Sequence, residues 1–257
     1  MNGEKVQYLS REKDFRCRLT GVLGRPVKCH VIPKAFYDIP DQREGVYRQY
    51  SNTPECFSKR IPKGVYDKGI VTNKGENILA SFDDYAAMLL LGEFDKAKPL
   101  HQGDELIAWL LEDYNFKLLM KFVLSVLWRM HSSNWESYKK ICLSEEEEKS
   151  IRDFLLDEDG LDAGNYSVVI ARWNDEYGEG KEFGPVFLDS HEEQDGGFRI
   201  YCGHYIFYIK NVSEPIPKEL AHAQVSPGKP LVVLARKLRQ SKEWKVMKNI
   251  ARGRPKG

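Results

Sequence analysis

One apolar segment near the middle of the chain constrains the fold most strongly. From Phe116 to Met130 apolar residues lie all round a helical wheel, interrupted by two lysines and Arg129. A helix that is apolar on every side is buried, and three charges make this segment a poor membrane span. We therefore expect a long helix, capped by Asp104 and ending near His131, to form the core of the protein.

The segments before this helix have shorter and more varied patterns. Residues 15–33 contain two short extended runs around glycines and a proline, which predicts a β-hairpin. Residues 38–64 are polar and read as a long loop, and residues 65–72 as a short strand. From 75 to 92 apolar residues return with helical spacing.

After the core helix the pattern first stays helical and then changes to strands. Ser144 and Glu147 form a capping box, which predicts a helix that ends near Asp157. Four later runs are rich in β-branched and aromatic residues and bounded by glycine, proline or asparagine. They predict an antiparallel sheet of about four strands, from residues 166–173, 183–187, 197–210 and 231–236. The expected fold class is therefore α+β.

Charge is distributed unevenly along the chain, although the net charge is only +1. Residues 1–75 carry +7, residues 141–197 carry −13, and residues 236–257 carry +8. A polyanion should therefore bind the two ends of the chain and be repelled by its middle.

The cysteines and the first residues indicate a cytoplasmic protein. Five cysteines form no paired spacing, which favours reduced thiols over a disulfide framework. The first fourteen residues are polar and charged and lack the apolar stretch of a secretion signal. No charge-free apolar stretch is long enough for a membrane span, so we expect no membrane partner.

A short motif at the end of the predicted hairpin carries the first functional signal. Cys29 and His30 precede Val31-Ile32-Pro33, and a histidine at a strand end can act as a general base for a water molecule. Together with Cys17-Arg18-Leu19-Thr20, and with Tyr66–Thr72 followed by Gly75, the motif resembles the HNH, or His-Me finger, endonucleases. The resemblance is to a bacterial branch with a four-cysteine zinc knuckle. It covers about residues 15–135 and implies a ββα finger.

The zinc knuckle of that branch is degenerate in this chain. Of its four cysteine positions only Cys17 is retained, and Thr20, Thr72 and Gly75 occupy the others. Threonine and glycine are not usual zinc ligands, so we expect no structural zinc. A substitute site from Cys17, Cys29, His30 and Cys56 stays open as an alternative.

The resemblance also implies a catalytic set. His30 would be the general base, and Glu76 or Asn77 would occupy the metal-ligand position on the following helix. Glu76, Asp83 and His30 could hold one Mg²⁺ or Mn²⁺, which would stabilise the leaving oxygen of a cleaved phosphodiester. Residues 76 and 83 are two helical turns apart, about 10 Å, so at most one of them should contact the metal. The alternative is a structural His30 beside a solvated acidic helix face.

The chain ends in a second motif. Arg252-Gly253-Arg254-Pro255-Lys256 resembles the AT-hook, a peptide that lies in the narrow minor groove of A·T-rich DNA. Upstream, Lys242, Lys245 and Lys248 could contact phosphates. Such segments are usually disordered when free.

These observations predict four regions and two candidate functions. The regions are an HNH-like finger at 1–100, a helical region at 101–163, a β-rich domain at 164–235 and a disordered basic tail at 236–257. The first candidate is a DNA-binding nuclease of an anti-phage defence system. The second is an inactive HNH-like scaffold that acts as a DNA-tethered module for a protein partner.

Overall fold

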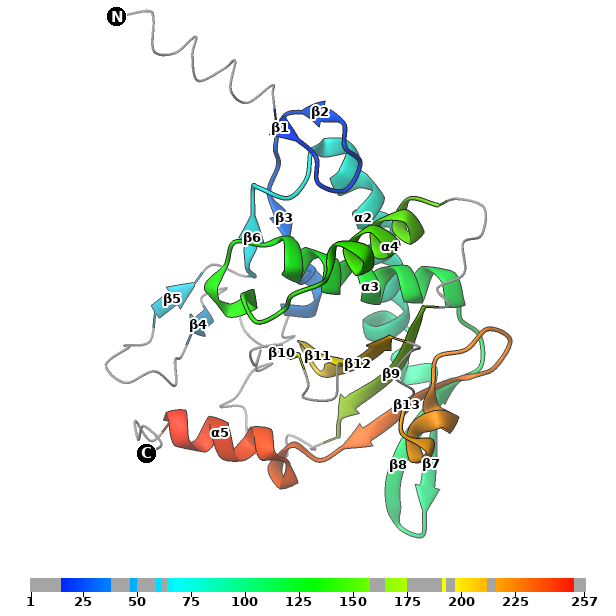
Figure 1. Cartoon of the computed structure of the whole chain (residues 1–257). Helices are drawn as coiled ribbons and strands as arrows, with labels where there is room; N and C mark the ends of the chain where they lie inside the picture. Colours follow the sequence, from blue (N-terminus) through cyan, green and yellow to red (C-terminus); the bar gives the residue numbers. More distant parts are fainter. Residues whose placement is uncertain are drawn as a thin grey trace, which may run out of the picture.

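A computed structural model of the chain describes residues 15–37, 47–49, 59–61, 64–157, 165–174, 191–192, 197–211 and 216–251. Helices and strands are mixed throughout (Figure 1). The α-helices are α2 (Asn73–Ala87), α3 (Phe116–Ser132), α4 (Glu145–Leu156) and α5 (Lys242–Ala251). A π-helical turn, η2 (Met88–Gly92), continues α2, and shorter 3₁₀ turns include η1 (Lys34–Tyr37) and η3 (Phe94–Lys96).

A seven-stranded sheet is the largest element, with the strand order β10-β11-β12-β9-β13-β8-β7. Every neighbouring pair is antiparallel except β9 and β13, which run parallel. Its strands are β7 (Lys98–Gln102), β8 (Glu105–Leu111), β9 (Tyr166–Trp173), β10 (His191–Glu192), β11 (Gly197–Cys202), β12 (Tyr205–Asn211) and β13 (Leu231–Arg236). Three two-stranded pairs lie outside it: β1 (Phe15–Arg16) with β2 (Leu23–Gly24), β3 (Cys29–His30) with β6 (Tyr66–Asp67), and β4 (Tyr47–Gln49) with β5 (Lys59–Ile61).

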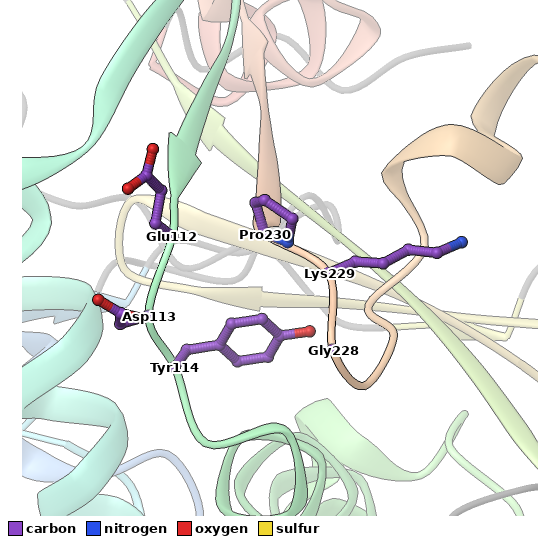
Figure 2. A pocket seen from close by; sticks show the side chains of 6 residues that line it. All are labelled: Glu112, Asp113, Tyr114, Gly228, Lys229 and Pro230. Carbon is purple, nitrogen blue, oxygen red and sulfur yellow. The ribbon is translucent and has the colours of Figure 1, made fainter.

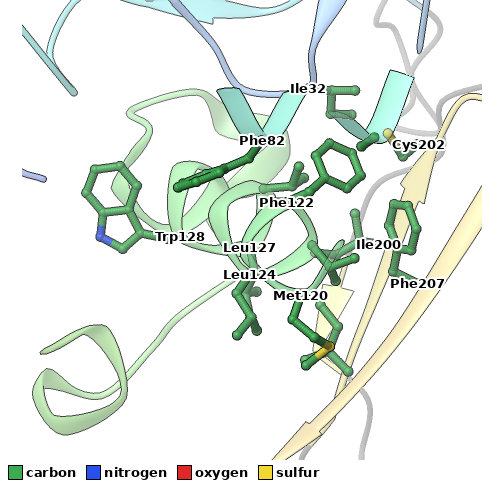
Figure 3. Packing of buried hydrophobic residues seen from close by; sticks show 14 of the residues in the cluster. Ile32, Phe82, Met120, Phe122, Leu124, Leu127, Trp128, Ile200, Cys202 and Phe207 are labelled. Carbon is green, nitrogen blue, oxygen red and sulfur yellow. The ribbon is translucent and has the colours of Figure 1, made fainter. Parts of the chain in front are cut away.

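Helix α3 is the centre of the main core, as its sequence predicts. Thirteen of its seventeen residues are buried. Phe122 packs between Phe36 of η1 and Phe207 of β12, so one ring joins the N-terminal segment to the sheet. Figure 3 shows α3 side chains between Phe82 of α2 and the strands β11 and β12.

The opposite face of the sheet is covered by the C-terminal helix. Successive strand side chains alternate between the two faces, so Val168 and Ile170 belong to the α3 core while Ala171 and Trp173 face α5. Met247 of α5 completes this second cluster. Lys242, Lys245 and Lys248 therefore belong to a helix packed on the sheet and not to an extended tail.

The expected helix from Asp104 is wrong in its first half. Residues 105–111 form strand β8, because Gly103, with φ +61°, and Asp104 make a tight turn that pairs β8 with β7. Helix α3 begins after Asn115, whose side chain accepts a hydrogen bond from the Leu118 amide. The main sheet thus takes β8 from the region expected to be helical, and β7 from the residues just before the expected helix.

Of the other elements predicted from the sequence, the structure confirms some and corrects others. The helix with the Ser144 capping box is confirmed as α4, and the strand within 65–72 as β6. The hairpin expected over 15–33 is only partly correct, because β1 pairs with β2 but β3 pairs with β6. The loop expected at 38–64 contains the β4–β5 pair. The expected strand at 183–187 lies outside the described residues. Within the described chain, no helix has the length and apolarity to cross a membrane.

A buried carboxylate attaches α5 to the sheet. One oxygen of Glu243 accepts hydrogen bonds from Tyr201 (3.1 Å) and Arg199 (3.3 Å), and lies 3.5 Å from Arg236. Burial alone would raise the pKa of Glu243. Its own backbone amide, the Arg236 charge and the Tyr201 hydroxyl together lower the pKa below its ordinary value.

We predict that α5 loosens from the sheet in acid. Because the folded pKa of Glu243 is depressed, its contribution to stability is complete above the ordinary value of 4.5 and is lost as pH falls through the folded value. The NMR signal of the Trp244 indole should report this loosening below about pH 4.5. Glu243→Gln should remove that pH-dependent step, and an unchanged pH profile in this variant would contradict the assignment.

Candidate functional site

Two short strands and a helix bring the motif residues together. Strand β3 pairs antiparallel with β6, so that Cys29 is opposite Asp67 and His30 is opposite Tyr66. Five residues separate the end of β6 from the start of α2. We call β3, β6 and α2 the strand–helix unit.

His30 lies on the partly exposed side of β3. Its ring meets the Tyr66 ring edge to face, with centroids 6.1 Å apart. The main chain passes so close at Gly64 that a Cβ there would lie 3.1 Å from Cδ2 of His30. Burial lowers the pKa of His30, and the Arg129 and Lys34 charges lower it further. The imidazole is therefore neutral near pH 7 and able to accept a proton.

Cys29 and Glu76 form a separate pair, in which the thiol is fully buried and the carboxylate partly buried. The Cys29 thiol is fully buried, which raises its pKa, and it is hydrogen-bonded to the Glu76 side chain. Burial also raises the pKa of Glu76, whose Oε2 is buried with no hydrogen-bond partner. Neighbouring strand residues point to opposite faces, so Glu76 sits on the Cys29 side of β3.

Asp83 is paired with a core arginine. Arg129 of α3 donates to both carboxylate oxygens of Asp83, at 2.9 and 2.7 Å. It also donates to the His30 carbonyl at 2.9 Å and to the side chain and carbonyl of Ser125. Burial alone would lower the pKa of Arg129, but the Asp83 carboxylate raises it above its ordinary value.

The three residues expected to share a metal ion thus have three different sets of contacts. His30 lies against Tyr66, Glu76 against Cys29, and Asp83 against Arg129. Asn77, the alternative ligand, is exposed on α2. Among the residues that the structure describes, no three His, Cys, Asp or Glu side chains gather as a metal-binding group.

The four knuckle positions, in contrast, converge in space. Sγ of Cys17 accepts a hydrogen bond from the Thr20 amide at 3.4 Å and is also hydrogen-bonded by Thr72. A Cβ on Gly75 would lie 2.8 Å from the same sulfur. Burial would raise the pKa of the Cys17 thiol, but the hydrogen bonds from Thr20 and Thr72 lower it. Cys56, part of the alternative zinc set, lies outside the described residues.

Exposed basic side chains surround the strand–helix unit. Residues 15–37 contain five Lys or Arg and no Asp or Glu. Lys28 and Lys34 flank His30, Lys68 directly follows β6, and Lys74 lies in the first turn of α2; all four are exposed. A second basic face, made by Lys242, Lys245 and Lys248, lies on the solvent side of α5. The hook-like residues Arg252–Lys256 lie outside the described residues.

A shallow hollow lies elsewhere, between the end of β8 and the start of β13 (Figure 2). It is lined by Glu112, Asp113, Tyr114, Gly228, Lys229 and Pro230. The Tyr114 hydroxyl donates to the Ser226 carbonyl and closes one side. None of the candidate residues from the sequence lines this hollow, and we assign it no function.

Sequence reasoning missed the role of Arg129. In the sequence this residue reads only as a charge interrupting an apolar helix. The one signal for its role was its position inside an otherwise fully buried segment, since a buried charge requires a partner. No family model matches this chain, and neither the curated proteins nor the solved structures contain a match.

We predict that cysteines restored at the knuckle positions will bind zinc. The variant Thr20→Cys/Thr72→Cys/Gly75→Cys brings four sulfurs together, the usual ligand set of a structural zinc site, once the Cys17 sulfur moves to admit a Cβ at residue 75. Elemental analysis should give one zinc per chain for this variant and far less than one for the wild type. The same variant with Cys17→Ser should bind zinc more weakly. Chelator-resistant zinc in the wild type would contradict this prediction and favour the alternative set with Cys56.

We also predict that removing Asp83 lowers the free energy of unfolding more than removing its partner Arg129. The Arg129 side chain is 1% exposed and that of Asp83 19%, so Asp83→Ala leaves a charge that water cannot reach. Asp83→Ala should cost about 3–5 kcal/mol of unfolding free energy, and Arg129→Met should cost less. Asp153→Ala, in the exposed pair with Lys149, should cost at most about 1 kcal/mol. Urea unfolding would measure all three, and equal losses for Asp83→Ala and Asp153→Ala would contradict a core role.

Proposed function

We propose that this protein binds duplex DNA through the basic segment 15–37, which includes strand β3 of the strand–helix unit, and through α5. The observation that carries the proposal is the run of residues 15–37, which has five basic side chains, no acidic one, and His30 within it. Phosphate contacts supply most of the affinity of non-specific DNA binding. The resemblance to HNH endonucleases and the convergence of the four knuckle positions support the same proposal.

Helix α5 provides the second contact. Lys242, Lys245 and Lys248 are spaced by three residues, so they follow one helix face with a rise of about 4.5 Å between them. Glu243 and Met247 hold the other face against the sheet. If the lysines of α5 contact phosphates, the Arg-Gly-Arg-Pro segment that follows the helix in sequence would be close enough to bind in the minor groove.

We predict that the two basic surfaces contribute separately to DNA affinity. Lys28→Gln/Lys34→Gln and Lys242→Gln/Lys245→Gln/Lys248→Gln should each weaken binding and reduce the salt slope, by up to about 0.9 for each phosphate that is no longer neutralised. Fluorescence anisotropy with a labelled duplex across a salt series would measure both effects. Arg254→Ala should instead abolish the preference for A·T-rich over G·C-rich duplex.

The matched control removes three exposed lysines from another part of the surface. Lys139→Gln/Lys140→Gln/Lys149→Gln changes the net charge as much as the α5 triple variant does. It should leave the salt slope nearly unchanged. If it weakens binding as much as the α5 variant, bulk charge and not a defined surface holds the DNA. If the wild type binds no duplex at all, the proposed function is wrong.

Metal-dependent cleavage is a second candidate, favoured by two observations. The His30 imidazole is neutral and partly exposed, and Glu76 Oε2 is a buried acceptor without a partner among the described residues. Glu76 fits a cation as one ligand, and Mg²⁺ commonly takes its remaining ligands from water and substrate phosphate. Such an ion would stabilise the leaving oxygen of the phosphodiester. His30, on the other side of β3, would accept the proton of the attacking water if the substrate reached across the end of the strand.

We predict that His30→Ala abolishes any Mg²⁺- or Mn²⁺-dependent nicking of supercoiled plasmid. His101→Ala, which changes an exposed histidine on β7, should nick like the wild type. Equal nicking by the wild type and His30→Ala would show that His30 is not the base. Tight DNA binding without nicking by the wild type would favour the scaffold, in which the β-rich part contacts a protein partner of an anti-phage defence complex.

A further inference from the structure

A single arginine near one end of the sheet is enclosed by aromatic rings. Arg172 is the second-last residue of β9 and pairs with Tyr205 of β12. Its guanidinium carbon lies 4.2 Å from the ring centroid of Phe94, and 5.7 Å from those of Trp109 and Tyr205. We call these three residues the aromatic cage.

The cage is fixed by its own contacts. The Phe94 ring meets the Trp109 and Tyr205 rings edge to face, with centroids 5.4 and 5.8 Å apart. The Tyr205 hydroxyl donates to the Leu90 carbonyl of η2. Because the rings hold its flat group, the guanidinium is oriented before any ligand arrives.

Arg172 has no hydrogen-bond acceptor and no ion pair among the described residues. Its Nε is buried without a partner, while the residue as a whole is partly exposed. Asp95, whose charge raises the pKa of Tyr205, forms no ion pair with Arg172. The contrast is Arg129, whose donors all have protein acceptors.

Aromatic faces stabilise a cation, but they leave its in-plane N–H groups unpaired. A buried donor without an acceptor costs folding free energy, so a cage built only for stability would be better filled by an apolar side chain. What the arrangement does supply is two terminal nitrogens held in one plane, on a side chain that is partly exposed. Such a guanidinium edge matches the oxygens of an oxyanion in a bidentate geometry.

We propose that Arg172 and the aromatic cage form a receptor for a phosphate group. The geometry is independent of the strand–helix unit, but the choice of phosphate over carboxylate rests on the proposed DNA-binding function. Burial and the Arg172 charge lower the pKa of His204, the residue before Tyr205. His204 is therefore uncharged near neutral pH, and Arg172 is the group that neutralises the ligand.

The first experiment follows the Nε–H signal of Arg172 by ¹⁵N NMR in the full chain. Sodium phosphate should shift this signal saturably, whereas sodium chloride and sodium acetate at equal ionic strength should not. Two oligonucleotides of the same sequence, one with a 5′-phosphate and one with a 5′-hydroxyl, distinguish a terminal phosphate from the phosphates of the DNA backbone as the ligand. A shift with the first alone indicates a terminal phosphate, and a shift with both indicates the backbone. An equal response to acetate and phosphate, or no response to either, would overturn the proposal.

The second experiment separates binding from a purely structural role. Arg172→Met keeps an apolar side chain in the cage and removes the unpaired donors, so its melting temperature should equal or exceed that of the wild type. Both Arg172→Met and Arg172→Lys should lower phosphate affinity at least about tenfold. Arg152→Gln on α4 should keep the wild-type affinity. A markedly lowered melting temperature in Arg172→Met, with phosphate affinity retained in Arg172→Lys, would show that Arg172 only stabilises the fold.

The two proposals can fail separately. Phosphate binding without duplex binding would contradict the proposed DNA-binding function and leave the phosphate receptor supported.

Discussion

The buried guanidinium of Arg129 is the interaction on which the arrangement of the N-terminal half depends. One side chain on the core helix holds α2 through Asp83 and β3 through the His30 carbonyl. The strands of this unit are only two residues long and cannot be stable alone. Units this small usually need a metal, a disulfide or a larger neighbour for stability. Here hydrogen bonds around Cys17 occupy the knuckle positions, and Arg129 supplies a fixed link to the core.

Two acidic residues that could have been metal ligands are paired with protein groups instead. Asp83, a candidate metal ligand by sequence, is the counter-ion that makes a buried Arg129 tolerable. The Glu76 side chain is hydrogen-bonded to the Cys29 thiol. His30 and the exposed Lys28, Lys34, Lys68 and Lys74 lie in and around the unit, beside the exposed Asp84 of α2, and these lysines could contact phosphate. On the opposite face of the sheet Glu243 also holds a helix in place through buried charge pairs. It pairs with Arg199 and Arg236 and so fixes the basic helix α5 to the sheet.

Sequence reasoning succeeded where local patterns decide the structure. The buried helix around Phe122, the capping box at Ser144 and strands β9, β11, β12 and β13 follow from periodicity and turn chemistry. The expected antiparallel sheet of about four strands has seven, because β7, β8 and β10 were not expected, and its β9–β13 pair is parallel. It failed where partners are distant in sequence. The helix expected from Asp104 is strand β8, which pairs with β7 across a tight turn and, on its other edge, with β13, about 120 residues later. The convergence of Cys17 with Thr72 and Gly75 could be expected only from the family resemblance, and the partner of Arg129 could not be read from spacing at all.

Our central proposal is that a metal-free strand–helix unit, fixed by Arg129, presents a DNA-binding surface together with α5. Hydrogen–deuterium exchange of the wild type in EDTA, with and without duplex DNA, tests it most directly. We expect slow exchange at β3 and β6 without any metal, and added protection on DNA binding at residues 28–34 and 242–251. Rapid exchange throughout β3 and β6 in EDTA, or protection confined to other parts of the chain, would contradict it.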